Sequence, residues 1–265
     1  MITLNPRTDA LVVVDAQPTF MPGGGLAVPE GDQIIPVIKR LMLLFPREVR
    51  FATKDRHKIG SVSLASSFVG LQAFHRLTYE EFLENFVGLL GNLDTLVTDT
   101  EIHIENDESD NSIKLSSDAL FGLEELKGYL KQVKYQTLWP DHALEGTEEA
   151  ELHPQLPERL FEYVQVKGLD PICDSYSGFR DALGRPTGLG ELVRMRGITR
   201  AFYVGLCGNV CVGHTANDGM SEGIEGYMIK DATRDVLMQE LTDEMDSRFA
   251  KTGVRVITSD MIKGW

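Results

Sequence analysis

The sequence is poor in cysteine and in long apolar runs. Its three cysteines, Cys173, Cys207 and Cys211, are an odd set without the spacing of a disulfide framework. No apolar run approaches the roughly 20 residues that a membrane-spanning helix needs. The opening residues, MITLNPRTDALVVV, have no basic segment followed by a long apolar core. We therefore expect the reducing cytoplasm as the compartment and no membrane as partner.

Positive charge is scarce as well. The 265 residues include 26 Lys and Arg against 40 Asp and Glu, which gives a net charge of −14. Nucleic acids and anionic membranes bind basic surfaces, so the sequence argues against both as partners. A small neutral or cationic substrate is compatible with this charge. The composition, 42% hydrophobic and 25% charged, is that of a globular protein long enough for one large α/β domain. A homo-oligomer is left open.

Short apolar runs alternate with helical patterns along the chain. This alternation predicts a doubly wound parallel sheet with helices on both faces, whose ligands bind outside the carboxyl ends of the strands. Buried strands are predicted from apolar, branched residues, and helices from apolar periodicity. We expect strands at 10–14, 49–53, 161–166, 200–204, 226–230 and 254–258, and helices at 34–41, 190–196, after Cys211 and at 233–250.

The alternation of strand and helix patterns is interrupted at about residues 69–136. We interpret this segment as an insertion in a single domain spanning residues 1–265. Two amphipathic helices are expected in it, at 79–90 and 119–132. They are separated by the acidic stretch DTEIHIENDESDNS, which we interpret as a solvated surface, with a docking function as the alternative. His75 and His103 are taken as surface or packing residues.

Cys211 lies in the stretch GLCGNVCVGHTA, where a buried strand is expected to turn into a helix. The positive end of a helix dipole lowers the pKa of a thiol and favours the reactive thiolate. We therefore predict that Cys211 is a nucleophile. The alternative is that Cys211 is a small buried hydrophobe, as most lone cysteines are.

Three further reactive side chains are predicted at the carboxyl ends of strands: Asp15, Asp55 and Lys167. Each has an ordinary explanation on its own, since Asp15 could cap a helix and Lys167 could lie at the surface. Together with Cys211 they place a base and a cation beside a thiol, as nucleophilic catalysis by cysteine requires. Asp55 and His57, two residues apart in an extended segment, can point to one side and share a metal ion.

Five segments in this order resemble the signature segments of nicotinamidases, also called pyrazinamidases, in the isochorismatase-like cysteine hydrolase superfamily. They are VVVDAQPTFMPGGGLAVPEGDQIIP, KDRH, LWPDHALEGT, VKGLDPICDSYSGF and VGLCGNVCVGHTANDG. The resemblance covers most of the chain outside the insertion. It implies a six-stranded parallel sheet with helices on both faces.

The resemblance also implies the residues of catalysis. Asp15, Lys167 and Cys211 would be the catalytic triad, and a cis peptide would join Leu206 to Cys207. The backbone N–H groups of Cys207 and Cys211 would form the oxyanion hole. The implied reaction is hydrolysis of nicotinamide, or pyrazinamide, to the acid and ammonia through a cysteine thioester, in pyridine nucleotide salvage.

A metal ion and an aromatic pocket are implied in the same way. The metal would be zinc as first choice, with iron or manganese as alternatives, since two histidines and one carboxylate suit all three. The metal ligands would be Asp55, His57 and His142, and the pocket walls Phe20, Trp139 and Tyr176.

Three positions depart from the family pattern. Thr19 and Asn209 stand where the family usually has aspartate, which puts hydrogen bonds that hold loops in doubt. An amide oxygen such as that of Asn209 can still accept a hydrogen bond. Ser61 stands where the family often has a further histidine ligand.

Two other functions stay open at this stage. A different small-amide hydrolase of the same fold, acting on a carbamoyl or ureido amide, would share the triad but would not need the metal set. A non-catalytic interaction protein would use the acidic insertion as its binding surface.

Overall fold

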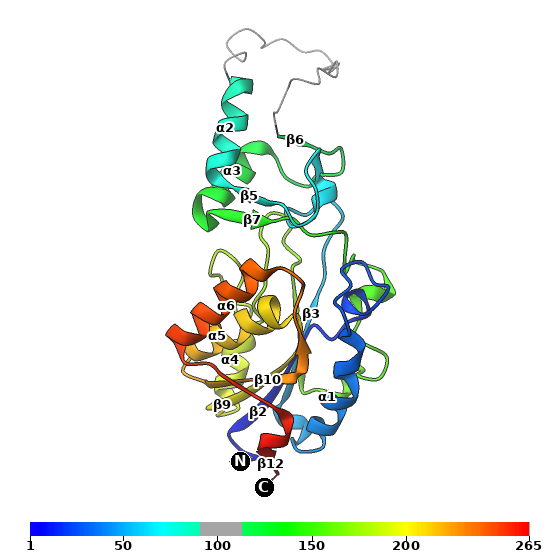
Figure 1. Cartoon of the computed structure of the whole chain (residues 1–265), viewed down its shortest axis with the longest axis vertical. Coiled ribbons are helices and arrows are strands. Elements are labelled where there is room, and N and C mark those ends of the chain that lie inside the picture. Colours follow the sequence, from blue (N-terminus) through cyan, green and yellow to red (C-terminus); the bar gives the residue numbers. More distant parts are fainter. Residues whose placement is uncertain (91–112, 265) are drawn as a thin grey trace.

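A six-stranded parallel sheet forms the centre of the molecule in this computed structural model, which describes residues 1–90 and 113–264 (Figure 1). All six predicted strands are present, and neighbouring strands run parallel. Across the sheet, the order is β11 (Arg255–Ile257), β10 (Glu225–Arg234), β9 (Arg200–Leu206), β2 (Asp9–Val14), β3 (Arg50–Asp55) and β8 (Tyr163–Lys167).

Helices cover both faces of this sheet, which confirms the doubly wound fold. Figure 1 shows α1 (Ile34–Met42) on one side of the strands. On the other side lie α4 (Leu189–Met195), α5 (Gly213–Ser221) and α6 (Gln239–Thr252). Strand β2 is buried at all six positions because β3 and β9 flank it and helices cover it, which explains its continuous apolar run.

The predicted helix at 233–250 was wrong at its start. Thr233 and Arg234 still belong to β10, where they pair with Gly205 and Leu206 after a shift in register. Helix α6 begins only at Gln239. Pairing with a neighbouring strand is a long-range effect, so the local pattern of the sequence does not show it.

The segment that we interpret as an insertion forms a second lobe above the sheet (Figure 1). It contains two antiparallel strand pairs, β4 (Phe68–Val69) with β6 (Lys114–Leu115) and β5 (Arg76–Thr78) with β7 (Tyr135–Thr137). Its helices are α2 (Tyr79–Leu90) and α3 (Leu123–Val133). Helix α3 begins four residues later than expected, after Gly122, whose N–H donates to the Glu125 carboxylate.

This lobe has a hydrophobic core of its own, separate from the core around the sheet. Four members, Val62, Phe68, Leu138 and Cys173, come from outside residues 69–136, so the lobe also packs against neighbouring loops. The buried members are Val62, Phe68, Leu77, Phe82, Ile113, Phe121, Leu126, Tyr129, Leu130, Leu138 and Cys173.

Polar contacts also join the second lobe to α6. The Arg76 guanidinium lies 2.8 Å from the Glu244 carboxylate and 4.2 Å from the centre of the Tyr135 ring. The Tyr135 hydroxyl donates to the same carboxylate at 3.3 Å. His75 pairs with Glu81 within the lobe. The acidic stretch and His103 lie outside the described residues.

A short parallel pair, β1 (Ile2–Thr3) with β12 (Ile262–Lys263), brings the two ends of the chain together. Within residues 1–90 and 113–264, no helix combines the length and the apolar character needed to cross a membrane.

The first prediction concerns the second lobe. Replacing residues 79–132 by a short Gly/Ser linker should preserve the six-stranded sheet, because every strand of that sheet lies outside the replaced segment and the entropic cost of loop closure rises slowly with length. Some stability should be lost, since Leu77 and Leu138 lose the side chains that bury them. Circular dichroism should report a folded α/β protein. An unfolded spectrum would contradict the interpretation as an insertion.

Candidate active site

Four reactive side chains meet at the carboxyl edge of the sheet. Asp15 follows β2 directly, and Asp55 and Lys167 are the last residues of β3 and β8. Cys211 lies in a π-helical turn (Gly208–Val212) between β9 and α5. Ligands of open α/β sheets bind at this edge, and the convergence predicted from the sequence is confirmed.

The Lys167 ammonium group is at the centre of this arrangement and is fully buried. Its Nζ lies 2.9 Å from Asp15 Oδ2, 3.2 Å from Asp55 Oδ1 and 3.5 Å from the Cys211 sulfur. It also donates to the carbonyl of Ser175 at 2.9 Å. Burial lowers the pKa of Lys167, but the two carboxylates outweigh burial and hold it well above its ordinary value. Lys167 is therefore a permanent cation that joins the carboxylates to the thiol.

Asp15 is held in an unusual backbone conformation, with φ at +47°, a region that residues other than glycine rarely adopt. Its Oδ1 accepts a hydrogen bond of 2.6 Å from the Thr53 hydroxyl. Among the described residues, Oδ2 has the Lys167 ammonium nearby but no well-aligned hydrogen-bond donor. Burial raises the pKa of Asp15, against the opposing effect of Lys167, so the carboxylate is a stronger base than usual.

Burial has the same effect on Cys211. The thiol is fully enclosed, and burial raises its pKa well above the ordinary value despite the nearby Lys167. The expectation that the pKa of Cys211 is lowered was therefore wrong, because burial, together with the charges of Asp15 and Asp55, outweighs the opposing charge of Lys167. The resting group is the thiol, and a base has to remove its proton.

A cis peptide bond joins Leu206 to Cys207 at the end of β9, as the resemblance implies. It directly precedes the turn that carries Cys211. Both cysteines line a small cavity at the carboxyl edge of the sheet. The catalytic roles of their N–H groups remain a proposal.

Three potential metal ligands gather beside Lys167: Asp55, His57 and His142. One ligand atom from each lies within 4.8 Å of the others, and all three residues are buried. Asp55 Oδ2 is 3.1 Å from Nε2 of His57 and 3.5 Å from Nε2 of His142. Although burial opposes it, the interactions with His57 and Lys167 keep the pKa of Asp55 well below its ordinary value, so the carboxylate is charged.

The chemistry of this set fits a divalent ion. Nδ1 of His142 lies 2.8 Å from the Pro140 carbonyl, which can only accept, so Nδ1 carries the proton and Nε2 is left free toward Asp55. Such an outer hydrogen bond is typical of metal-binding histidines. The backbone of Gly168 lies directly against two of these side chains, and only glycine fits there, because a Cβ would lie 2.7 Å from Asp55 Oδ1 and 2.8 Å from the His57 ring.

The three departures from the family pattern each have a local explanation. The Thr19 hydroxyl accepts from the N–H of Ala143, next to His142, so it holds that loop in place of a carboxylate. The Asn209 amide oxygen accepts from Val236 N–H, and its amide nitrogen donates back to the Val236 carbonyl. Ser61 instead closes a turn by bonding to the Lys58 carbonyl and takes no part in the histidine set.

Aromatic side chains enclose the small cavity, which has a volume of about 20 Å³. The Phe20 ring packs 5.6 Å from the His142 ring. Trp139 Nε1 donates to the Tyr176 hydroxyl at 3.1 Å, which fixes the two rings edge to face. The structure thus brings together the implied ring walls, the metal set and Cys211 around one cavity.

Sequence reasoning missed Asp174, which lines the same cavity. Its Oδ1 accepts from the Ser175 N–H, and its Oδ2 accepts from Nε2 of Gln136 at 2.8 Å. The Tyr129 hydroxyl in turn donates to Gln136 Oε1 at 2.7 Å. Asp174 is part of the segment DSYSGF, where its acidic side chain two residues before Tyr176 was the available signal. Gln136 and Tyr129 had no such signal, because both belong to the insertion.

Comparisons with known proteins agree with this geometry. The isochorismatase domain model matches residues 124–261. The chain is 31% identical over 253 residues to a nicotinamidase of Acinetobacter baylyi, covering 94% of this chain and 92% of that protein. It is 30% identical over 233 residues to a nicotinamidase of Escherichia coli, covering 87% and 84%. A solved nicotinamidase and pyrazinamidase structure from Acinetobacter baumanii superimposes with a TM-score of 0.72 and 29% identity, covering 97% of this chain and 99% of that one.

The second prediction tests the support that the insertion gives to the cavity wall. Gln136→Leu should lower the free energy of unfolding by about 1–3 kcal/mol, because buried Asp174 Oδ2 then loses its donor. Gln132→Leu is the matched control. Its amide is exposed and bonds only to the Gly128 carbonyl, so a change within about 0.5 kcal/mol is expected. Urea unfolding measures both, and equal stability of the two variants would contradict the role of Gln136.

Proposed function

The chain belongs to the isochorismatase family of hydrolases, and we propose that it is a nicotinamidase, which hydrolyses nicotinamide, and pyrazinamide by the same chemistry, to the acid and ammonia. The observation that carries the proposal is the contact of Lys167 with Asp15, Cys211 and Asp55 at once. Lys167 thus joins the side chains that we propose as base and nucleophile to one of three potential metal ligands, and Cys211 and these ligands line an aromatic pocket. The reaction would recover nicotinate for NAD synthesis.

Asp15 is the general base of the proposed mechanism. Its Oδ1 is taken by the Thr53 hydroxyl, so Oδ2 is the oxygen available to receive the proton of the Cys211 thiol. Burial raises the pKa of Asp15 and so makes it a stronger base, but it also raises the pKa of Cys211, so the proton transfer depends on the contact of Lys167 with both groups. Lys167, in contact with both side chains, stabilises the thiolate as it forms.

The thiolate then attacks the carboxamide carbon and forms a tetrahedral intermediate. The N–H groups of Cys207 and Cys211 hold its oxyanion, a kind of contact worth about 3 kcal/mol for each donor. Asp15 returns its proton to the departing ammonia, which leaves a thioester on Cys211. A water molecule activated by the same carboxylate opens the thioester and releases nicotinate.

Asp55, His57 and His142 would hold the divalent ion. Zinc is the first choice for two histidines and one carboxylate, and iron or manganese would also suit them. When bound, the ion would supply a ligand position for the pyridine nitrogen and so orient the ring. The aromatic walls, Phe20 and Tyr176 among them, pack the ring and exclude water.

The metal set distinguishes this proposal from a carbamoyl or ureido amide hydrolase of the same fold. Such an enzyme needs Asp15, Lys167 and Cys211, but gains nothing from three buried ligands next to them. Two buried histidines that share one carboxylate are the kind of ligand set that a zinc site uses. A purely non-catalytic role for the chain would not require this set. We place the enzyme in the cytoplasm.

The experiment that tests the function is the release of ammonia from nicotinamide by the purified, metal-loaded protein. Turnover of nicotinamide and pyrazinamide is expected. Turnover of a carbamoyl or ureido amide without turnover of nicotinamide would support the first rival, and no turnover of any amide would support the interaction protein.

The third prediction concerns the nucleophile. Cys211→Ala should abolish turnover but leave nicotinamide binding, because the pocket walls and the metal ligands do not depend on the sulfur. Cys173→Ala is the control and should leave the rate of ammonia release nearly unchanged, since Cys173 is packed in the hydrophobic core of the second lobe. Ammonia release and calorimetric binding measure the two effects. A Cys211→Ala enzyme that kept even a tenth of the wild-type rate would rule out covalent catalysis.

The fourth prediction concerns the metal. Asp55→Ala and His142→Ala should lose the bound ion and raise KM for nicotinamide steeply, because the ring nitrogen loses its partner. Benzamide has the same carboxamide without a ring nitrogen, so it should be a poor substrate of the wild type and lose little more in the variants. Metal analysis and steady-state kinetics check both. Equal turnover of benzamide and nicotinamide by the wild type would refute this role of the ion.

A further inference from the structure

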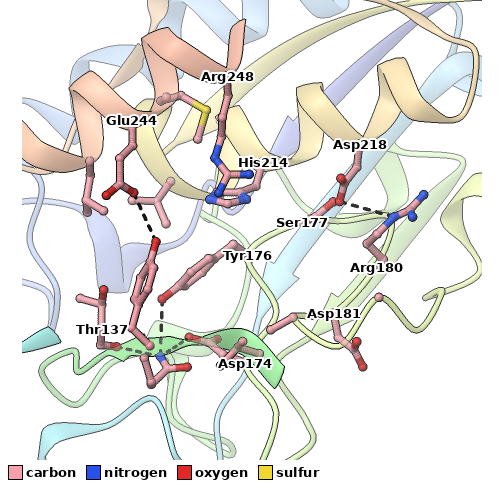
Figure 2. A pocket seen from close by; sticks show the side chains of 18 of the residues that line it. Thr137, Asp174, Tyr176, Ser177, Arg180, Asp181, His214, Asp218, Glu244 and Arg248 are labelled. Carbon is pink, nitrogen blue, oxygen red and sulfur yellow. Dashed lines mark hydrogen bonds and ion pairs between the residues drawn. The ribbon is translucent and has the colours of Figure 1, made fainter. Parts of the chain in front are cut away.

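A larger cavity, with a volume of about 390 Å³, lies beside the small catalytic one (Figure 2). The second lobe forms one side of it, and α5 and α6 form the other. Its size is that of a small-molecule site. The two cavities share four wall residues, which are Trp139, Asp174, Tyr176 and Val210. A ligand in this outer cavity would therefore lie against the same side chains that enclose the catalytic pocket.

The acidic groups of the outer cavity already have partners. Glu244 pairs with Arg76, and Asp218 lies 3.7 Å from Arg180. Asp174 accepts from Gln136. Asp181 pairs with Arg185, so a cation lies beside each of these carboxylates except Asp174, whose partner Gln136 is neutral.

Arg248 is different. Among residues 1–90 and 113–264, no carboxylate forms an ion pair with its exposed guanidinium, although burial raises the pKa of Asp218 and the charges of Arg180 and Arg248 oppose that effect. Figure 2 shows Arg248 pointing from α6 into the outer cavity toward His214. An unpaired guanidinium in a cavity wall favours carboxylate or phosphate groups, which it can bind through two parallel hydrogen bonds.

Two aromatic rings stand beside this cation. The rings of Tyr176 and His214 are 5.3 Å apart at a tilt of 49°. Burial, with the nearby charges of Arg248 and Lys167, lowers the pKa of His214 to about 3, so its ring is uncharged at neutral pH. His214 therefore presents a neutral aromatic surface and does not compete with Arg248 for an anion.

We propose that the outer cavity is a second binding site, for small aromatic carboxylates, in which Arg248 binds the carboxylate and the rings of His214 and Tyr176 contact the aromatic ring. The choice of ligand rests on the proposed function, since that reaction releases one pyridine carboxylate, nicotinate, per turnover. The substrate is a neutral amide and offers no charge to Arg248. The site thus distinguishes the product from the substrate.

This site has a kinetic consequence. In the proposed site, a carboxylate bound to Arg248 contacts Tyr176, a wall of the catalytic pocket, but does not take the position of nicotinamide beside Cys211. Inhibition of the enzyme by a carboxylate in the outer cavity would lower kcat, and a saturating concentration of nicotinamide would not overcome it. A ligand that enters only the catalytic pocket would compete with nicotinamide and leave kcat unchanged.

Benzoate is the probe for the test, because it has the ring and the carboxylate but no ring nitrogen for the metal. Rates of ammonia release are measured over a range of nicotinamide concentrations at several benzoate concentrations, with the metal-loaded wild type and with Arg248→Gln. We expect benzoate to lower kcat in the wild type. Arg248→Gln should weaken this inhibition about tenfold or more, as expected for the loss of a charge-assisted hydrogen bond. Its kcat and KM without benzoate should be unchanged.

Lys251→Gln is the matched control, since it removes the same charge from the same helix outside the outer cavity. Benzamide is the neutral control ligand, and Arg248→Gln should not alter its effect. Purely competitive inhibition by benzoate, or equal inhibition of the wild type and Arg248→Gln, would overturn the proposal. If the wild type released no ammonia from nicotinamide, the proposed function would fail. Calorimetric titration with benzoate would then still decide the site, which requires weaker binding by Arg248→Gln than by Lys251→Gln.

Discussion

The buried ammonium group of Lys167 is the interaction on which the rest of the site depends. It balances Asp15 and Asp55, two buried carboxylates at the ends of neighbouring strands. Removing one partner of such a buried set typically costs about 3–5 kcal/mol, because it leaves an uncompensated charge. The same ammonium group contacts the Cys211 sulfur. The cation that neutralises the two buried carboxylates therefore also stabilises the thiolate of Cys211. Parallel pairing of β3 with β2 and β8 makes this possible, since it brings all three strand ends to one edge.

The second lobe is connected to this centre by hydrogen bonds as well as by packing. Gln136 and Tyr129 hold Asp174, which lies in the wall between the catalytic cavity and the outer one. Glu244 ties α6 to the lobe through Arg76 and Tyr135. The lobe therefore completes the surroundings of the catalytic pocket and creates the outer cavity with its unpaired Arg248. Asp15, Lys167 and Cys211 lie at the sheet edge, whereas the lobe contributes part of the wall of the outer cavity.

Much of this could be predicted from the sequence. Buried parallel strands have distinctive apolar runs, and a reactive side chain directly after such a run must lie at the carboxyl edge, so Asp15, Asp55 and Lys167 were found by position alone. The start of α6 could not be predicted, because β10 is extended by pairing with β9. The high pKa of the Cys211 thiol follows from complete burial, which local sequence does not report. The support of Asp174 by Gln136 joins residues 38 positions apart and depends on how the lobe folds back.

In the proposed mechanism Cys211 carries the acyl group, Asp15 accepts and returns the proton of its thiol, and Lys167 stabilises its thiolate. The most direct test is to quench the wild-type enzyme with acid during turnover of nicotinamide and to identify the modified peptide by mass spectrometry. A nicotinoyl thioester on Cys211 is predicted, and it should be absent from the Cys211→Ala enzyme. Turnover without an acyl adduct on any cysteine, or an adduct on Cys207 or Cys173 in place of Cys211, would contradict the account.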